Sequence, residues 1–239
     1  MVDNLEELIE KAFLLNKTEF SHTQILEKLS SSILVEQTLG LLKLNKLKSI
    51  EETLILASML NHPHSRLRDM ASEVILDFIS EKEFLPLFEN NEFYKIAINS
   101  ASDINPNVCR NIILVLGCLT NKMLIYDELQ KNINLIIKNL GNESNYGKTP
   151  DYDKLVFQLF WNLKSIHYLL KNYAFEYDLT LLIETLKWTS NFADYTVREQ
   201  SAYVVSVVNS NIAEIQILRN KLRDDSNFYV KSAANSGKV

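Results

Sequence analysis

The sequence predicts an all-α fold in which about five stacked helix pairs follow a group of N-terminal helices. Apolar residues recur three and four positions apart through most of the 239 residues, and no sustained two-residue alternation of a half-buried strand occurs. The five Gly and four Pro are too few for many tight hairpins. Polar segments that precede helices recur every 43 to 44 residues, which is a period typical of helical repeats.

Three prolines mark this period. Pro63, Pro106 and Pro150 stand 43 and 44 residues apart, and a further 44 residues lead to Asp194. Each lies in or after a short polar segment, and an apolar helical pattern begins within a few residues. Proline is tolerated at a helix start because the first amides have no acceptor within the helix. We therefore expect the second helix of a pair to begin near each of these positions.

The N-terminal residues 1–48 are expected to form helices at 5–16 and 23–43, with Gly40 as a candidate bend. The first clear second helix covers 65–80, where the apolar residues form one broad stripe. About twelve helices are expected in all. The expected first helices of the pairs cover 50–60, 83–98, 122–140, 179–189 and 212–222.

The expected repeats form a single domain over 1–239, because one helix pair cannot bury both of its apolar faces without its neighbours. We assign the polar segment 141–149 to a loop inside the third repeat, since the period on either side of it is undisturbed. The predicted repeats cover about 50–80, 83–121, 122–173, 178–209 and 211–236.

The second helices open in a similar way, with an aliphatic residue, often a basic residue, and a small or apolar residue one turn later. This pattern resembles the second helix of HEAT repeats, within the armadillo-like family, over about residues 50–236. The resemblance implies a right-handed α-solenoid whose second helices line a concave surface. The copy after Pro150 lacks the arginine, and the copy after Pro106 has Cys109 before Arg110. The matching groups are Leu67-Arg68 with Ala71, Val108 with Ile112, Val197-Arg198 with Ala202, and Val230-Lys231 with Ala234.

Charge and composition restrict the location and the partners. The net charge of −5 disfavours nucleic acid and favours a protein or peptide partner. No run approaches the roughly 18 apolar residues of a membrane helix, and the acidic start, Met1 to Glu10, is unlike a secretory signal. Nine helical steps place Cys109 and Cys118 on opposite sides of a helix, so they cannot easily form a disulfide. Two unpaired apolar thiols are typical of a reducing compartment. We expect a cytoplasmic protein without membrane association.

Standard catalytic motifs are missing. The sequence has no glycine-rich phosphate loop, HExxH pair, CxxC pair or nucleophile elbow, so it favours a non-enzymatic protein without cofactor, metal or catalytic residues. His62 and His64 flank Pro63, but two imidazoles without further ligands favour a solvated loop over a metal site. The HEAT-like iron hydroxylases use repeated His-Glu pairs, and this sequence has none.

An alternative reading is a HEAT-like DNA glycosylase of the alkylation-repair class. Such enzymes hold DNA in a basic groove with tryptophans and an acidic residue near the lesion, and Trp161, Trp188 and Asp194 supply these residue types. The negative net charge argues against it, because DNA binding gains affinity by releasing counterions from phosphates.

An aromatic series on one helix is the first part of the candidate binding site. Phe157, Trp161, Lys164 and Tyr168 lie four, three and four positions apart, beside the expected core stripe. Aromatic residues supply much of the binding energy of protein interfaces. The competing interpretation is packing between repeats. If Trp161 belongs to the interface, Trp161→Ala weakens partner binding with little loss of stability.

Arginines at the starts of second helices are the second part. Arg66, Arg68, Arg110 and Arg198 could form a basic ridge for an acidic partner. For Arg68 and Arg198 the HEAT resemblance instead implies pairing with a loop aspartate, Asp103 or Asp194. The candidate binding residues are therefore Trp161, Lys164, Tyr168, Arg66 and Arg110. The predicted function is a protein-binding scaffold or adaptor, of which an inhibitor or immunity-type partner is one form.

Overall fold

The computed structural model describes residues 17–142, 150–209 and 211–236. These residues form thirteen α-helices and one 3₁₀ helix, and none of them lies in a β-strand, so the predicted all-α fold class is confirmed. The expected helix over 5–16 and most of the expected loop 141–149 lie outside the described residues. None of the helices that the structure describes is long and apolar enough to cross a lipid bilayer.

The helices group into two compact units. Unit 1 comprises residues 1–100 and 105–120, and unit 2 comprises residues 101–104 and 121–239. The prediction of one domain over 1–239, with the repeat boundaries given above, stays a prediction.

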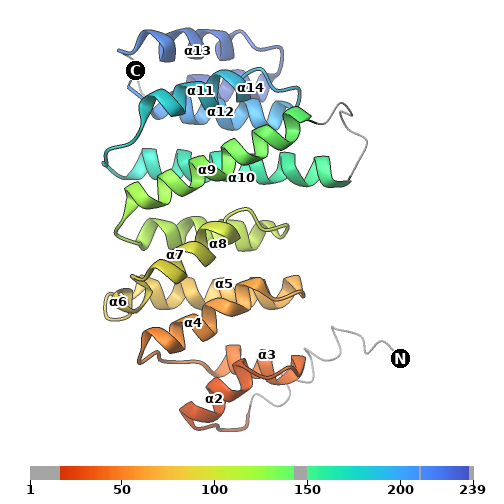
Figure 1. The fold of residues 1–239 in the computed structure, drawn as a ribbon, viewed down its shortest axis with the longest axis vertical. Helices are drawn as coiled ribbons and strands as arrows, with labels where there is room; N and C mark the ends of the chain where they lie inside the picture. Colours follow the sequence, from red (N-terminus) through yellow and green to blue (C-terminus); the bar gives the residue numbers. More distant parts are fainter. Residues whose placement is uncertain (1–16, 143–149, 210, 237–239) are drawn as a thin grey trace. The chain divides into compact units, whose positions relative to one another are not determined.

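In unit 1 the helix pairs pack in chain order (Figure 1). The second helix of one pair, α5, packs against the second helix of the next, α8, and the first helices α4 and α7 also pack together. The N-terminal helices α2 and α3 pack on each other, and they contact α4 and α5 respectively. The elements are α2 His22–Leu29, α3 Leu34–Lys43, α4 Ile50–Ser58, η1 Met59–Asn61, α5 Ser65–Ser80, α6 Leu85–Phe88, α7 Asn91–Ser100 and α8 Pro106–Cys118.

Unit 2 has the same plan with three helix pairs (Figure 1). The second helices α10, α12 and α14 form one layer, in which α12 packs against both of the others. The first helices form the other layer, in which α11 contacts α9 and α13. The elements are α9 Lys122–Asn142, α10 Pro150–Asn172, α11 Leu179–Thr189, α12 Tyr195–Val207, α13 Ala213–Arg223 and α14 Phe228–Asn235.

The repeating polar segments begin the second helices, as the period predicts. Pro106 and Pro150 are the first residues of α8 and α10. Asn105, Asp194 and Asn227 cap α8, α12 and α14, because each side chain accepts a hydrogen bond from the backbone amide two residues later. Such caps satisfy amides that have no acceptor within the helix.

Two expected helices are interrupted in the structure. The expected helix over 83–98 is divided into α6 and α7 at Glu89 and Asn90, where the Asn90 side chain accepts a hydrogen bond from the amide of Phe93 at 2.9 Å. The expected helix over 23–43 is divided by Ser30 to Ile33, because the Ser31 hydroxyl bonds the amide of Ile33. Side-chain bonds of this kind compete with helical hydrogen bonds.

The prediction of a bend at Gly40 is wrong. It lies within α3, and a Cβ atom at this position would approach the Leu29 backbone nitrogen to 2.9 Å. The missing side chain therefore allows α2 and α3 to approach closely.

Each unit has its own apolar core and buried polar bonds. Leu67 and Ile112 are fully buried in unit 1, as are Leu159 and Leu182 in unit 2. In unit 2, buried Gln130 joins the two first helices α9 and α11. Its amide group donates to the Tyr126 hydroxyl at 2.8 Å and accepts from the Thr185 hydroxyl at 3.2 Å.

Candidate functional site

The five candidate binding residues lie in both units. Arg66 is on α5 and Arg110 on α8, in unit 1, whereas Trp161, Lys164 and Tyr168 are on α10, in unit 2. The structure therefore places two residues on one surface and three on another, and each surface is described by itself.

Arg66 and Arg110 are joined through a polar network across α5 and α8. A guanidinium nitrogen of Arg66 lies 3.7 Å from Oδ2 of Asp69, and the same oxygen accepts a hydrogen bond from the Asn107 amide at 3.4 Å. Asn107 Oδ1 in turn accepts a hydrogen bond from Arg110 at 2.9 Å. One turn further along, Asn111 donates to the Ser72 hydroxyl at 3.0 Å. This edge of unit 1 is polar, and its groups satisfy one another.

Arg68 and Arg198 have structural roles in their own loops. Arg68 is 7% exposed and donates hydrogen bonds to the carbonyl oxygens of His62 and Pro63 at 2.8 and 3.1 Å. Arg198 binds the corresponding carbonyls of Phe192 and Ala193 at 2.9 and 2.7 Å. Each arginine thus holds the loop that precedes its own helix.

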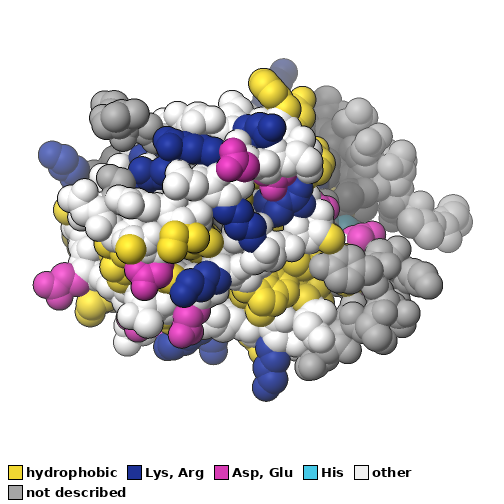
Figure 2. Space-filling view, turned by 90° about the horizontal axis from the view of Figure 1, so that it is seen from above, with side chains coloured by type: hydrophobic (Ala, Val, Ile, Leu, Met, Phe, Trp, Pro, Cys, Tyr) yellow, Lys and Arg dark blue, Asp and Glu magenta, His cyan; other side chains and the backbone are white. Residues whose placement is uncertain are grey.

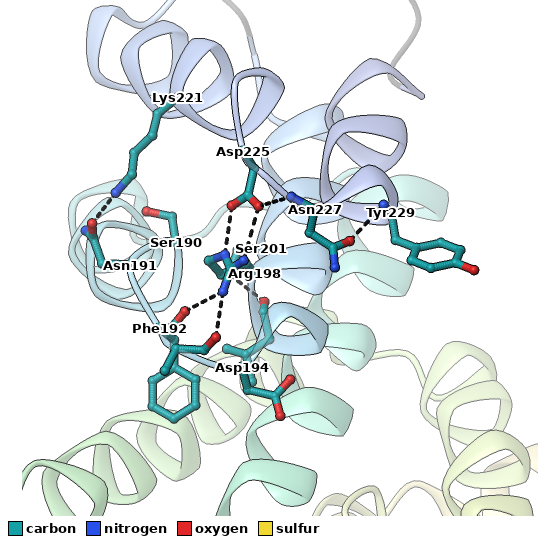
Figure 3. A network of polar contacts seen from close by, with 12 residues as sticks. Ser190, Asn191, Phe192, Asp194, Arg198, Ser201, Lys221, Asp225, Asn227 and Tyr229 are labelled. Carbon is teal, nitrogen blue, oxygen red and sulfur yellow. Dashed lines mark hydrogen bonds and ion pairs between the residues drawn. The ribbon is translucent and has the colours of Figure 1, made fainter. Parts of the chain in front are cut away.

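Arg198 also pairs with an aspartate of the following repeat. Its Nε and Nη2 donate to the two carboxylate oxygens of Asp225 at 2.7 and 3.1 Å, a geometry shown in Figure 3. The hydrogen bond from Arg198 lowers the pKa of Asp225 below its ordinary value, against an opposing effect of burial. The expectation that Asp194 would be the partner is wrong, because Asp194 accepts hydrogen bonds from the amide and hydroxyl of Thr196 and caps α12.

Trp161 is enclosed by aromatic and basic side chains of its own helix. The residue is 4% exposed, and its ring lies 6.0 Å from the Phe157 ring and 5.4 Å from the Phe160 ring. The ammonium group of Lys164 lies 4.7 Å from the ring centroid, a cation–π contact. The indole Nε1 is buried and has no hydrogen-bond partner among the described residues. This burial favours the packing interpretation of Trp161.

A pocket of about 390 Å³ lies beside Trp161, between the first three turns of α10 and the start of α12. It combines aromatic side chains with two carboxylates. It also brings Trp161 and Asp194 to one site. We call it the α10–α12 pocket; its lining residues are Tyr152, Asp153, Val156, Phe157, Phe160, Trp161, Asp194 and Thr196.

Further aromatic residues, more exposed than the half-buried Phe157 and Phe160 of the pocket, lie at the starts of the second helices α12 and α14. Tyr195, the first residue of α12, is 42% exposed, and its ring stacks 6.2 Å from that of Tyr229 on α14. Tyr229 is 58% exposed and its neighbour Phe228 73%. In Figure 3 the Tyr229 ring points away from the Arg198–Asp225 pair. We call Phe157, Phe160, Tyr195, Phe228 and Tyr229 the aromatic strip.

Tyr168 lies further along α10 and is half-buried, with its ring 6.2 Å from that of Tyr173. His167, beside it, packs 5.4 Å from the Tyr203 ring of α12. Burial, reinforced by Lys171 and Lys164, lowers the pKa of His167 to about 4. This histidine is therefore neutral at pH 7 and acts as a packing group.

Trp188 and the histidines His62 and His64 were considered for a DNA glycosylase and for a metal site, respectively. Trp188 does not line the α10–α12 pocket; it lines a separate pocket of about 540 Å³ with Phe192, Glu184, Lys187 and Asn191. The His62 and His64 rings stack 5.3 Å apart. Among the described residues, no three His, Cys, Asp or Glu side chains are grouped so that they could hold a metal ion.

Lys and Arg side chains gather on the face that Figure 2 shows, which is seen from above the view of Figure 1. They alternate with apolar patches, and a few acidic side chains lie among them. On the last helix pair the exposed basic residues Lys221, Arg223 and Lys231 are accompanied by the acidic Glu214 and Asp224. The surface therefore carries charge of both signs.

Five residues of the pocket and the aromatic strip were not predicted from the sequence, namely Asp153, Phe160, Tyr195, Phe228 and Tyr229. One pattern could have identified two of them. Tyr195 and Phe228 each follow directly after a capping residue, Asp194 or Asn227, and so begin a second helix. The capping Asp and Asn can be recognised in the sequence, so an aromatic residue directly after one can be placed at the start of a helix.

No known family model and no curated protein matches the sequence. Among solved structures, the chain is similar to a designed armadillo repeat protein in complex with the peptide (KR)4, with 12% identity, 90% of this chain and 96% of that chain covered, and a TM-score of 0.49. Two engineered proteins are also similar. One has 12% identity, coverage of 98% and 96%, and a TM-score of 0.43; the other has 13%, 95% and 93%, and 0.40.

The fold assignment follows from the packing within each unit. Helix pairs contact the next pair in chain order, second helix to second helix, in both units. A single pair could not bury its apolar faces alone, which is the physical basis of repeat proteins. Each unit therefore has the stacked helix pairs of an α-solenoid, the type of fold that the HEAT-like sequence pattern predicts.

Proposed function

We propose that this protein is a non-enzymatic scaffold that binds a protein or peptide partner through the second-helix layer of unit 2. One observation carries the proposal: the second-helix layer of unit 2 presents the aromatic α10–α12 pocket together with exposed aromatic residues at the starts of α12 and α14, where Tyr195 and Tyr229 stack. Exposed aromatic residues gathered on one layer of helices, with polar neighbours, are typical of protein interaction sites.

The strip supplies the residue types that interfaces use as anchors. Tyr and Phe bring a large contact area with few rotatable bonds, so that ordering them on binding costs little entropy. Of the residues predicted from sequence, Lys164 and Tyr168 lie on the same helix and could extend the contact. Trp161 is buried and forms part of the pocket lining. Arg66 and Arg110 would take part only if the partner also covers the α5–α8 edge of unit 1.

The DNA glycosylase alternative is less well supported. Trp161 and Asp194 do share a pocket, but Asp153 adds a second carboxylate to it. Two carboxylates repel the phosphates that such a site would have to hold, and the whole chain is acidic. The cytoplasmic location stays a prediction.

Site-specific photo-crosslinking tests the proposal. A photoreactive residue is placed at Tyr195 or at Tyr229, and the protein is irradiated in lysate of its native cell. The matched control is Leu135, which is as exposed but lies on α9, in the other layer of unit 2. We expect one protein to be crosslinked from Tyr195 and Tyr229 and to be absent from the Leu135 sample.

Three results would contradict this function. Equal crosslinking from Leu135 would mean non-specific contact, and no crosslinked protein from either strip position would remove the proposed surface. Salt-sensitive binding of duplex DNA at low ionic strength would favour the glycosylase alternative. A further photoreactive residue at Arg110 shows whether the partner also contacts unit 1.

A further inference from the structure

The α10–α12 pocket has a chemical character of its own within the aromatic strip. Its walls are the aromatic side chains of Tyr152, Phe157, Phe160 and Trp161, and its rim carries the carboxylates of Asp153 and Asp194. None of the described residues that line it is a lysine or an arginine. Aromatic faces and carboxylates both attract a cation, and both repel an anion.

We propose that this pocket binds the side chain of an arginine or lysine from the partner segment. The inference rests on the proposed function, because it identifies one residue type in the bound partner. The volume of about 390 Å³ lies within the roughly 300–1,000 Å³ of ordinary ligand pockets. It has room for an extended side chain together with some of the adjacent main chain.

The aromatic wall already holds one cation. Lys164 lies over Trp161 at 4.7 Å and over Phe160 at 5.7 Å from the ring centroids. These rings are therefore oriented so that a basic group can reach them. Lys164 is not among the residues that line the pocket, so it does not occupy the pocket itself.

The two carboxylates are available for pairing. Asp194 uses Oδ1 to cap α12, and its Oδ2 accepts no hydrogen bond from the residues that the structure describes. Asp153 is exposed in the first turn of α10, and neither of its carboxylate oxygens accepts a hydrogen bond from the described residues. Arg198 interacts electrostatically with Asp194, but its guanidinium group is hydrogen-bonded to Asp225. Arginine should be preferred to lysine, because a planar guanidinium can stack on a ring and bind a carboxylate with two hydrogen bonds.

A fluorescence titration can test the pocket without knowledge of the partner. The chain has two tryptophans, so Trp188→Phe leaves Trp161, which lines the pocket, as the single reporter. The probes are acetyl-Gly-Arg-Gly-amide and the same peptide with citrulline, which has nearly the shape of arginine but no charge. At matched ionic strength, we expect the arginine peptide to change Trp161 emission with an affinity about fivefold or more above that of the citrulline peptide.

Charge-removing variants locate the effect. Asp194→Asn keeps the cap, because Asn caps helices as well as Asp does, and Asp153→Asn keeps the shape. We expect each to weaken binding of the arginine peptide about threefold, and the double variant about tenfold. The matched control is Asp151→Asn, an exposed carboxylate in the same first turn of α10 that does not line the pocket. It should change the affinity less than about twofold.

Thermal unfolding of each variant shows that the fold is retained, so that a loss of binding reports on the pocket. Equal affinity for the arginine and citrulline peptides would overturn the inference, and so would an Asp151→Asn effect as large as that of Asp153→Asn. If Tyr195 crosslinks a partner while the arginine peptide fails to bind, this inference is wrong and the proposed function stands. If the peptide binds while Tyr195 crosslinks nothing, the pocket is specific for cations and the proposed partner surface is wrong.

Discussion

The α5–α8 edge of unit 1 and the α10–α12 edge of unit 2 are built by the same packing of consecutive second helices, but their surfaces differ. In unit 1 the edge is polar: Asn107 and Asn111 of α8 bond Asp69 and Ser72 of α5. In unit 2 the corresponding edge is aromatic, with Phe157 and Phe160 beside a pocket. The same helix packing therefore supports two surfaces of different chemistry.

The difference includes the first residues of the second helices. This position holds Ser65 and Pro106 in unit 1; in unit 2 it holds Pro150 in α10, but the aromatic Tyr195 and Phe228 in α12 and α14. The repeat fold constrains the buried positions, whereas the first-turn positions remain free to vary. What such a scaffold binds is therefore decided by a few exposed residues, and the fold class alone does not decide it.

Trp161→Ala should have the largest effect, because the ring is buried under the aromatic edge. We expect the free energy of unfolding to fall by about 3–5 kcal/mol, as is usual for large aromatic side chains removed from a core. Chemical denaturation measures it. Trp161→Phe is the control: it keeps a ring and removes the unpaired Nε1, so we expect a much smaller loss. A loss below about 1 kcal/mol for Trp161→Ala would instead support the original interpretation as an exposed binding residue.

The arginines that bind loop carbonyls, Arg68 in unit 1 and Arg198 in unit 2, should contribute similarly to the free energy of unfolding, although the surfaces of the two units differ. Arg198→Ala removes hydrogen bonds to the carbonyls of Phe192 and Ala193 and leaves Asp225 without this cation. We expect a loss of about 2–3 kcal/mol, since bonds to charged groups are among the stronger ones. Arg68→Ala should cost a similar amount. If only one variant is destabilised, the two loops are not built in the same way.

The Arg198–Asp225 pair adds a pH dependence to unit 2. Its hydrogen bond lowers the folded-state pKa of Asp225, so the stabilisation is fully present above the unfolded-state pKa, which is ordinarily about 3.9. It is lost as the pH falls through the lower, folded-state value. Asp225→Asn should reduce stability at pH 7 and flatten its decline between about pH 4 and the lower folded-state pKa. Urea unfolding from pH 2 to pH 7 measures this, and an unchanged acid dependence would contradict it.

Asn111→Ala should have the smallest effect, because the polar edge of unit 1 lies near solvent. The variant removes one hydrogen bond to Ser72 on a half-buried side chain, and we expect a loss of about 0.5–1.5 kcal/mol. Partner binding through unit 2 should be unchanged. A loss of several kcal/mol would mean that the amides hold α5 and α8 together as strongly as apolar packing does.

Much of the fold could be predicted from the sequence because its causes are local. The prolines and capping residues begin α8, α10 and α12 where the period requires, and the apolar stripe of 65–80 is buried at Leu67, Ala71 and Phe78. The division of 83–98 was missed, because the cap at Asn90 competes with the helix in a way that apolar spacing does not reveal. The pairing of Arg198 with a loop aspartate was also predicted, although the partner is Asp225 and not Asp194.

The residues of the candidate site could be predicted only in part, because their exposure depends on packing between helices, which the spacing of residues along the sequence does not describe. The sequence by itself determined the helical fold, the repeat and which residues of α10 share a face, because helical periodicity fixes these within one segment. Only the tertiary structure decided that Trp161 is buried while Tyr195 and Tyr229 meet at the surface. A helix in such a layer has neighbours on both flanks, and the side chains of those neighbours decide which part of each face remains open.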